Sequence, residues 1–249
     1  MLARAMDVRR FRPPDASTLR PLGRAETALA LAARLPGYPG YVAFRKLKRR
    51  IAVRSRAAFD AAVAGLGPGD IAVDLGANIG TITRSLAATG ATVHAFEPDP
   101  ETFQHLQAGV GSLPNVHLHN AAAGGRDGTV TLYRPASWHD ETQRRSASKA
   151  ASVAEMAAKR GFEPSGSVPM IDFANFINSL NDVVQLIKVD IEGAEWDLID
   201  AVMARAPDRF EAMFVETHER LDPGVRPLVR DMQARFAAAP APYVNLFWT

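Results

Sequence analysis

From residue 71 onward, short apolar runs alternate with segments of helical periodicity, and this pattern constrains the fold more than any other feature. The runs IAVDL, TVHAFEP and VHLHNAAA are predicted strands, with the helical segments TITRSLAATG and PETFQHLQAGV between them. The same alternation continues through VVQLIKVDIEG, AEWDLIDAVMARA and FEAMFVETHE. Because such alternation is typical of parallel strands joined by helices, it predicts an α/β fold: a doubly wound, mostly parallel sheet with helices on both faces.

Composition places the chain among ordinary globular proteins. It has 249 residues, of which 47% are hydrophobic and 22% charged, enough for one large α/β domain with an extension. The absence of cysteine excludes disulfides, thiolate nucleophiles and cysteine-ligated zinc. No apolar run approaches the roughly 20 residues of a membrane span, and the first residues lack the apolar core of a signal peptide. We therefore expect a cytoplasmic protein.

Positive charge is concentrated in the N-terminal part of the sequence. Residues 1–60 hold 14 Lys and Arg against 4 Asp and Glu, whereas the remaining residues hold 15 against 23. We assign residues 1–58 to a basic helical extension, which prolines divide into short helices, and residues 59–249 to the α/β domain. The densest basic stretch, residues 44–56, favours a solvated helix face over a specific anion site. Few aromatic residues accompany these charges, so nucleic acid is not expected, while peripheral membrane contact is left open.

The glycine turn after the first predicted strand indicates a ligand site. It has the form Gly76-x-Asn78-x-Gly80, with Asp74 just before it. In a dinucleotide site the glycines bring the backbone close to a pyrophosphate, and a nearby carboxylate would repel that anion. S-adenosylmethionine carries an ammonium and a sulfonium group but no phosphate. We therefore expect this turn to accommodate its methionine end, with Asp74 helping to balance the positive charge.

A second acid and a row of small residues extend this candidate site. Glu97 ends the next predicted strand, 23 residues after Asp74, where doubly wound folds hold a ribose diol. Asn120 and Ala121, at the end of the third, are candidates for contact with adenine. Glu97 alone would also fit NAD. The alternative without a ligand is that Asp74 caps a helix and the glycines only pack strand against helix.

Five stretches together resemble the FkbM family of class I methyltransferases. VDLGANIGTIT and AFEPDP look like the family's first two motifs, and NAAAGGRDGTVTLY follows at the usual place. LIKVDIEGAEWDLI matches the most specific stretch, and MFVETHE resembles the strand after it. The resemblance covers about residues 71–219 and implies a Rossmann-like sheet, S-adenosylmethionine as methyl donor and an oxygen acceptor.

The resemblance leaves little sequence for the end of the fold. Only 30 residues follow Glu219, which is short for the helix and antiparallel hairpin that close this fold. A shortened sheet edge, or an edge completed by a partner chain in a homo-oligomer, is therefore left open.

Acids and a histidine at further strand ends are the candidates for catalysis, because ligands of open α/β sheets bind beyond the carboxyl ends of the strands. Asp190 and Glu192 follow one predicted strand, and His218 follows the next. A hydroxyl acceptor needs alignment and a base, and a histidine of ordinary pKa can act as a base near neutral pH. We expect no metal; the alternative is a divalent ion held by Asp190, Glu192, Glu216 and His218. Without a ligand, the two acids would cap the following helix and the histidine would be a hydrogen-bonded surface residue.

These features predict an S-adenosylmethionine-dependent O-methyltransferase that acts on a hydroxyl of a small or carbohydrate-like (glycan) acceptor. The long segment of residues 134–168, with one predicted helix at KAASVAEMAAKRG, would be a lid or binding loop. One alternative is an NAD(P)-dependent oxidoreductase on the same fold. The other is a non-catalytic protein that binds the cofactor.

Overall fold

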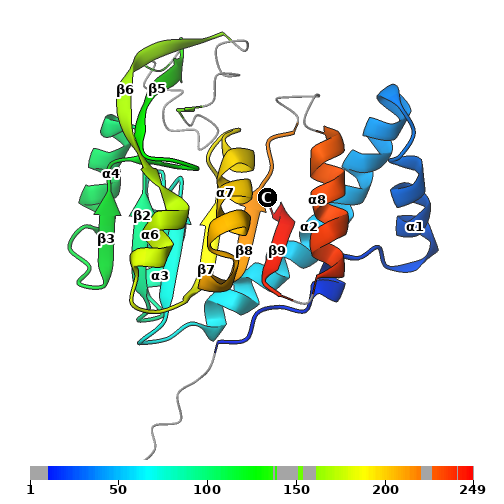
Figure 1. Ribbon diagram of the computed structural model, residues 1–249, viewed down its shortest axis with the longest axis horizontal. Helices are drawn as coiled ribbons and strands as arrows, with labels where there is room; N and C mark the ends of the chain where they lie inside the picture. Colours follow the sequence, from blue (N-terminus) through cyan, green and yellow to red (C-terminus); the bar gives the residue numbers. More distant parts are fainter. Residues whose placement is uncertain are drawn as a thin grey trace, which may run out of the picture.

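The computed structural model describes residues 11–136, 138, 151–153, 161–219, 226–239 and 241–248, and it contains the parallel sheet that the alternation predicts. Six strands lie in the order β3-β2-β1-β7-β8-β9, and every neighbouring pair is parallel (Figure 1). The strand order reverses between β1 and β7, which is where doubly wound sheets place their ligands. The strands are β1 (Ile71–Leu75), β2 (Thr92–Phe96), β3 (Val116–His119), β7 (Val184–Val189), β8 (Phe210–Glu216) and β9 (Tyr243–Trp248).

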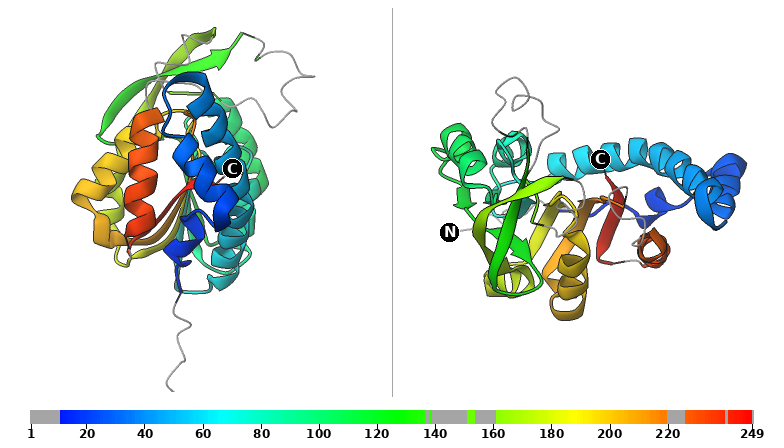
Figure 2. Two further views of the ribbon diagram at one scale, coloured as in Figure 1. Left: turned by 90° about the vertical axis from the view of Figure 1, so that its right-hand side faces the viewer. Right: turned by 90° about the horizontal axis from the view of Figure 1, so that it is seen from above.

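Helices cover both faces of this sheet. Figure 2 shows α2 (Gly37–Gly65), α3 (Thr81–Ala87) and α4 (Pro100–Val110) on one face, and α6 (Phe173–Ser179), α7 (Glu195–Arg205) and α8 (Arg226–Ala238) on the other. Successive residues of β8 divide between the two sides. Ala212 and Phe214 belong to the core cluster under α2, whereas Met213 and Val215 belong to the cluster under α6, α7 and α8. Both faces are buried, and this explains the continuous apolar runs in the sequence.

The N-terminal extension contains one long helix where the sequence predicted several short ones. After η1 (Ala16–Leu19) and α1 (Gly23–Ala32), α2 runs without interruption for 29 residues. Pro39 does not break it because it lies in the first turn, where a backbone N–H has no helical partner. The predicted boundary between residues 58 and 59 falls inside α2. Ile51 and Phe59, on either side of that boundary, belong to one core cluster that includes residues of β7 and β8.

The edge of the sheet is completed by this chain's own β9. It lies parallel to β8, with Met213 paired to Val244, and α8 forms the crossover. All of its residues are buried, and the ring of Trp248 lies 5.2 Å, centre to centre, from that of Phe59 in α2. No antiparallel hairpin occurs in residues 226–239 and 241–248. The edge therefore gives no reason to invoke a partner chain, and a homo-oligomer stays a prediction.

The third predicted strand is two strands in two sheets. β3 ends at His119, and β4 (Ala122–Gly124) joins a second sheet of order β4-β6-β5, which also contains β5 (Gly128–Pro135) and β6 (Phe162–Asp172). β5 and β6 are antiparallel and extend above the end of the main sheet toward which the arrow of β3 points (Figure 1). Most of the predicted helix at residues 149–161 lies outside the described residues.

The basic stretch of residues 44–56 lies on α2, and part of it is used inside the protein. Arg54 pairs with Glu26 of α1 at 2.8 Å, and Lys48 pairs with Glu219 at 3.0 Å. Three further cations line a shallow groove against α1: Lys46, Arg49 and Arg50. Within the described residues, no helix combines the length and the apolar character needed to cross a membrane. Peripheral membrane contact and a cytoplasmic location stay predictions.

Candidate active site

A cleft lies at the carboxyl ends of β1, β2 and β7, where the strand order reverses. Its walls come from the glycine turn after β1, the end of β2, the β3–β4 connection, the end of β7 and residues 151 and 153. Six of the ten residues selected from the sequence line it: Gly76, Asn78, Glu97, Ala121, Asp190 and Glu192. The other four are not among the residues lining it: Asp74, Gly80, Asn120 and His218.

Gly76 and Gly80 are needed for packing within the protein itself. Gly76 has a φ of 74°, and a Cβ atom there would lie 1.8 Å from the carbonyl oxygen of Asp190. Gly80, with a φ of 87°, precedes α3, and a Cβ atom there would lie 2.8 Å from the Leu106 side chain of α4. The space that these glycines leave at Cβ is thus filled by protein atoms, while the backbone of Gly76 still faces the cleft.

Asp74 lies fully buried beneath the glycine turn, and its charge is paired inside the protein. Thr83 donates a hydrogen bond of 2.7 Å to its Oδ2, and the ammonium group of Lys188 lies 3.1 Å from its Oδ1. The same ammonium group donates to the carbonyl oxygens of Leu75 and Gly76 at 3.2 and 2.7 Å. Asp74 therefore neutralises Lys188, whereas the sequence suggested a direct role in balancing the charge of a ligand.

The environment of Lys188 keeps it charged. Burial lowers the pKa of its ammonium group, but Asp74 and Asp190 outweigh burial, so the pKa is raised above its ordinary value. The ammonium group also lies 3.8 Å from Oδ2 of Asp190. Lys188 thus links the ends of β1 and β7 directly behind the cleft. Sequence reasoning did not select it, although a lone charge inside the apolar run VVQLIKV is a signal that a buried partner exists.

Glu97 ends β2 with both carboxylate oxygens bonded to backbone groups. Oε2 accepts from the N–H of Asn78 and Oε1 from the N–H of Asp99, each at 2.9 Å. A carboxylate oxygen can accept two hydrogen bonds, so each retains capacity for a ligand hydroxyl. Burial is the main reason why the pKa of Glu97 is raised to about 7; Asp99 adds to the effect, and the two backbone donors oppose it. The carboxyl group of Glu97 is thus half ionised near neutral pH.

The connection between β3 and β4 supplies a flat apolar wall. Ala121, which precedes β4, and Ala122 and Ala123 of β4 line the cleft together. Asn120 has a different role, because its side-chain amide donates to the carbonyl oxygens of Glu97 and Pro98 at 2.9 and 3.2 Å. It ties the end of β3 to the end of β2. A wall of methyl groups can accept a flat aromatic ring.

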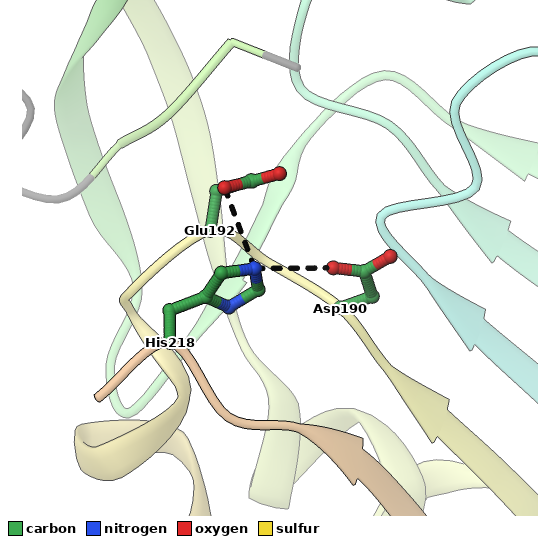
Figure 3. A group of neighbouring side chains, drawn as sticks. All are labelled: Asp190, Glu192 and His218. Carbon is green, nitrogen blue, oxygen red and sulfur yellow. Dashed lines mark ion pairs between the residues drawn. The ribbon is translucent and has the colours of Figure 1, made fainter. Parts of the chain in front are cut away.

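Asp190, Glu192 and His218 converge beside the cleft (Figure 3). Nε2 of His218 lies 3.4 Å from a carboxylate oxygen of Glu192 and 3.8 Å from one of Asp190. β7 ends at Val189, so both acids lie beyond the end of the strand. Glu192 adopts the left-handed backbone conformation, with a φ of 54°, and its side chain still points toward His218 (Figure 3). Glu216 is not part of this group of three.

His218 is buried and strongly held. Its Nδ1 lies 2.6 Å from Oε1 of Glu195, the first residue of α7. Burial alone would lower the pKa of His218, but Glu195, Glu192 and Asp190 outweigh burial and raise it to about 9. The intrinsic pKa of histidine is therefore shifted upward in this environment. In the absence of a bound cation, the shift favours the protonated imidazole at neutral pH, which does not act as a base.

Lys48 of α2 holds the segment that carries His218. Its ammonium group donates to the carbonyl and hydroxyl oxygens of Thr217 at 3.0 and 2.7 Å, and to both carboxylate oxygens of Glu219 at 3.0 Å. Both neighbours of His218 are thereby fixed from the N-terminal extension. No local signal pointed to Lys48, because its partners lie 169 and 171 residues away in the sequence.

Residues 151–153 belong to the segment expected to form a lid, and they border the cleft. Ser152 forms a β-bridge with Tyr133 of β5, and its hydroxyl donates to the carbonyl oxygen of Glu192 at 2.9 Å. Ala151 and Val153 line the cleft. This placement fits a lid or binding loop over the cleft, which stays a prediction.

The sheet narrows the class of protein, and the family match decides it. A doubly wound parallel sheet with a glycine turn after β1 and an acid at the end of β2 is shared by dinucleotide-binding enzymes and class I methyltransferases. The family match assigns the chain to the methyltransferases. Within that class the chain belongs to the FkbM methyltransferase family, because the model described as "Methyltransferase FkbM domain" matches residues 74–238. The matched region is thus a methyltransferase domain, and S-adenosylmethionine is the methyl donor that such a domain implies.

Curated relatives match over a short stretch only. "Ribosomal RNA small subunit methyltransferase A" from Thermotoga neapolitana is 46% identical over 55 residues, which are 22% of this chain and 21% of the relative. The protein of the same name from Rubrobacter xylanophilus is 38% identical over 60 residues, which are 24% of this chain and 23% of the relative. The match thus spans less than a quarter of the length of these relatives.

Among solved structures, the chain is similar to the methyltransferase FkbM from Methylobacillus flagellatus KT. The two share 17% sequence identity with a TM-score of 0.38, and the match covers 76% of this chain and 47% of that chain. A score that low adds no argument about the site. The family match carries the assignment.

Proposed function

We propose that this enzyme transfers a methyl group from S-adenosylmethionine to a hydroxyl group of a small or carbohydrate-like acceptor. The observation that carries the proposal is the convergence of two sets of residues on one cleft. Gly76, Asn78 and Glu97 lie at the ends of β1 and β2, and Asp190 and Glu192 lie at the end of β7. A donor held by the first set would present its sulfonium methyl group toward the second.

The donor would be held mainly by backbone and by one acid. Glu97 would accept hydrogen bonds from the two ribose hydroxyls, one on each carboxylate oxygen. The backbone of Gly76 and Asn78 would follow the methionine end, and adenine would lie against the alanine wall that includes Ala121. Asp74 would act through its ion pair with Lys188, because it does not itself line the cleft.

The transfer is an in-line displacement. The acceptor oxygen forms a bond to the methyl carbon as the carbon–sulfur bond breaks, and the electron pair of that bond stays on sulfur as S-adenosylhomocysteine forms. The hydroxyl proton passes to a carboxylate, for which Asp190 and Glu192 are the candidates. His218, whose pKa is raised to about 9 in the absence of a cation, would orient those two carboxylates rather than act as the base.

Calorimetric titration with S-adenosylhomocysteine, with NAD and NADP in parallel, tests the donor site. We expect the purified protein to bind S-adenosylhomocysteine with micromolar affinity and neither dinucleotide. Binding of a dinucleotide alone would instead indicate an oxidoreductase.

A screen with labelled donor tests the acceptor class. Glycans and other hydroxylated compounds would be offered as acceptors, together with a ribosomal RNA transcript, because the curated relatives are named as ribosomal RNA methyltransferases. Labelling of the RNA alone would contradict the proposed acceptor class.

Affinity for S-adenosylhomocysteine should fall as the pH is lowered through 7. Ribose hydroxyls that donate to Glu97 favour its ionised form, so binding must lower a pKa that is about 7 in the free protein. Linkage then predicts a dissociation constant about tenfold higher at pH 6 than at pH 8. Titration calorimetry at both values measures it. The dependence should disappear in Glu97→Gln, and a wild-type affinity that is equal at both pH values would remove Glu97 from the ribose site.

A further inference from the structure

We propose that Asp190, Glu192 and His218 together bind one divalent metal ion of the kind that accepts both oxygen and nitrogen ligands, such as Mn²⁺ or Zn²⁺. The inference concerns the same cleft as the proposed function and deepens it, but the binding itself can be measured without any acceptor. It also reverses the expectation from sequence that no metal is used.

The geometry of the three side chains suits a common ion. Each offers one ligand atom, and these atoms lie within 4.8 Å of one another. Nε2 of His218 lies 3.4 Å from Oε2 of Glu192 and 3.8 Å from Oδ1 of Asp190, and both distances are too long for a strong hydrogen bond. Ligand atoms that each lie about 2.1 Å from one ion are separated from one another by about 3.0–3.4 Å. The separations, which lie within 4.8 Å, would have to shorten toward that range when an ion binds.

His218 is oriented as metal-binding histidines are. Its Nδ1 donates to Glu195, which directs Nε2 toward the two acids. Glu195 is itself fixed, because its Oε1 also accepts from the N–H of Gly193 at 3.0 Å and the residue is fully buried. A carboxylate behind the far nitrogen sets the tautomer and raises the basicity of a ligating imidazole. The buried Glu195–His218 pair therefore supports a metal site independently of the two acids at the cleft.

The cleft gives an ion a route to these ligands. The side chains of Asp190 and Glu192 line the cleft and are 31% and 26% exposed, whereas that of His218 is 1% exposed and lies behind them. Lys188 lies 3.8 Å from Oδ2 of Asp190, which leaves Oδ1 directed at His218. Two carboxylates and an imidazole form a mixed oxygen and nitrogen donor set. A bound cation would lower the pKa of an acceptor hydroxyl that coordinates to it.

The competing explanation is that protonated His218 alone balances the acids, with no ion between them. Titration with Mn²⁺ distinguishes this explanation from a metal site. The full chain is first dialysed against a chelator, and free Mn²⁺ is then measured by electron paramagnetic resonance during the titration. We expect one Mn²⁺ per chain at micromolar concentrations. Asp190→Asn, Glu192→Gln and His218→Asn should each weaken binding by at least the 10- to 100-fold that is typical when a supporting carboxylate is removed.

Glu216→Gln is the matched control, because Glu216 is an acid at a neighbouring strand end outside the group of three. Its Mn²⁺ binding should equal that of the wild type, and thermal melts should establish that all four variants are folded. No Mn²⁺ binding below millimolar concentration, or binding that none of the three variants weakens, would overturn the proposal. S-adenosylhomocysteine titrated into the same samples shows whether the donor site itself fails, independently of the metal.

Discussion

Replacing Lys188 with methionine should destabilise the protein by about 3–5 kcal/mol, because it leaves the charge of Asp74 buried without a counter-ion. Asp74 is fully buried and Lys188 nearly so, and the two form an ion pair at 3.1 Å. A loss of that size is a large part of the roughly 5–15 kcal/mol that stabilises a typical domain. Urea unfolding followed by circular dichroism measures it.

An exposed ion pair provides the control for Lys188. Arg56 and Asp60 lie 3.4 Å apart on the surface of α2, with side chains 54% and 63% exposed, so Arg56→Met should change stability by less than about 1 kcal/mol. If Lys188→Met does not fold, the double variant with Asp74→Asn should recover folding, because the unpaired charge is then gone. A single variant as stable as Arg56→Met would show that Lys188 does not neutralise Asp74.

Replacing Asp190 with asparagine should reduce turnover by about 10²–10⁴-fold while leaving the affinity for S-adenosylhomocysteine nearly unchanged. Asp190 lies at the cleft beside Glu192 and His218 after the end of β7, whereas Glu97 follows β2, and β1 separates these two strands. Its carboxylate is therefore placed to act on the acceptor and not on the donor's ribose. The same loss of turnover is expected if Asp190 holds a cation instead of taking the proton itself.

Rates with a labelled donor and dissociation constants from calorimetry distinguish these roles. Asp197→Asn, a matched change at an exposed acid in the first turn of α7, should leave both quantities at the wild-type values. Equal losses of turnover and donor affinity in Asp190→Asn would instead assign Asp190 to donor binding.

The strands and their parallel arrangement could be predicted because they depend on local pattern. An apolar run flanked by helical segments indicates a strand buried on both faces wherever it occurs. The length of α2 could not be predicted in this way, since Pro39 is a helix breaker in most positions and is harmless only in a first turn. The division of VHLHNAAA between two sheets was missed because both parts of the run look equally strand-like.

The candidate site was predictable to the extent that its residues lie at strand ends. Glu97, Asp190 and Glu192 could be selected because the carboxyl ends of parallel strands meet at one edge. The electrostatic environment of these residues could not be predicted, because it depends on partners that are distant in the sequence. The pKa of about 9 at His218 requires Glu195, Glu192 and Asp190 to surround one imidazole, and no spacing in the sequence reveals that.

The position of α2 against β9 also constrains the order in which the chain can fold. The hydroxyl groups of Thr18 and Tyr243 lie 3.0 Å apart although 225 residues separate them, and Arg20 donates to the carbonyl oxygen of Ala237. Closing loops of that length loses conformational entropy before the contacts are made. The pairing of β1 with β2 needs only a short loop, but β9 has no complete place to dock until α2 and β8 are formed. Because Lys48 lies on the same helix, the segment that carries His218 is held in place only when α2 packs against the end of β8.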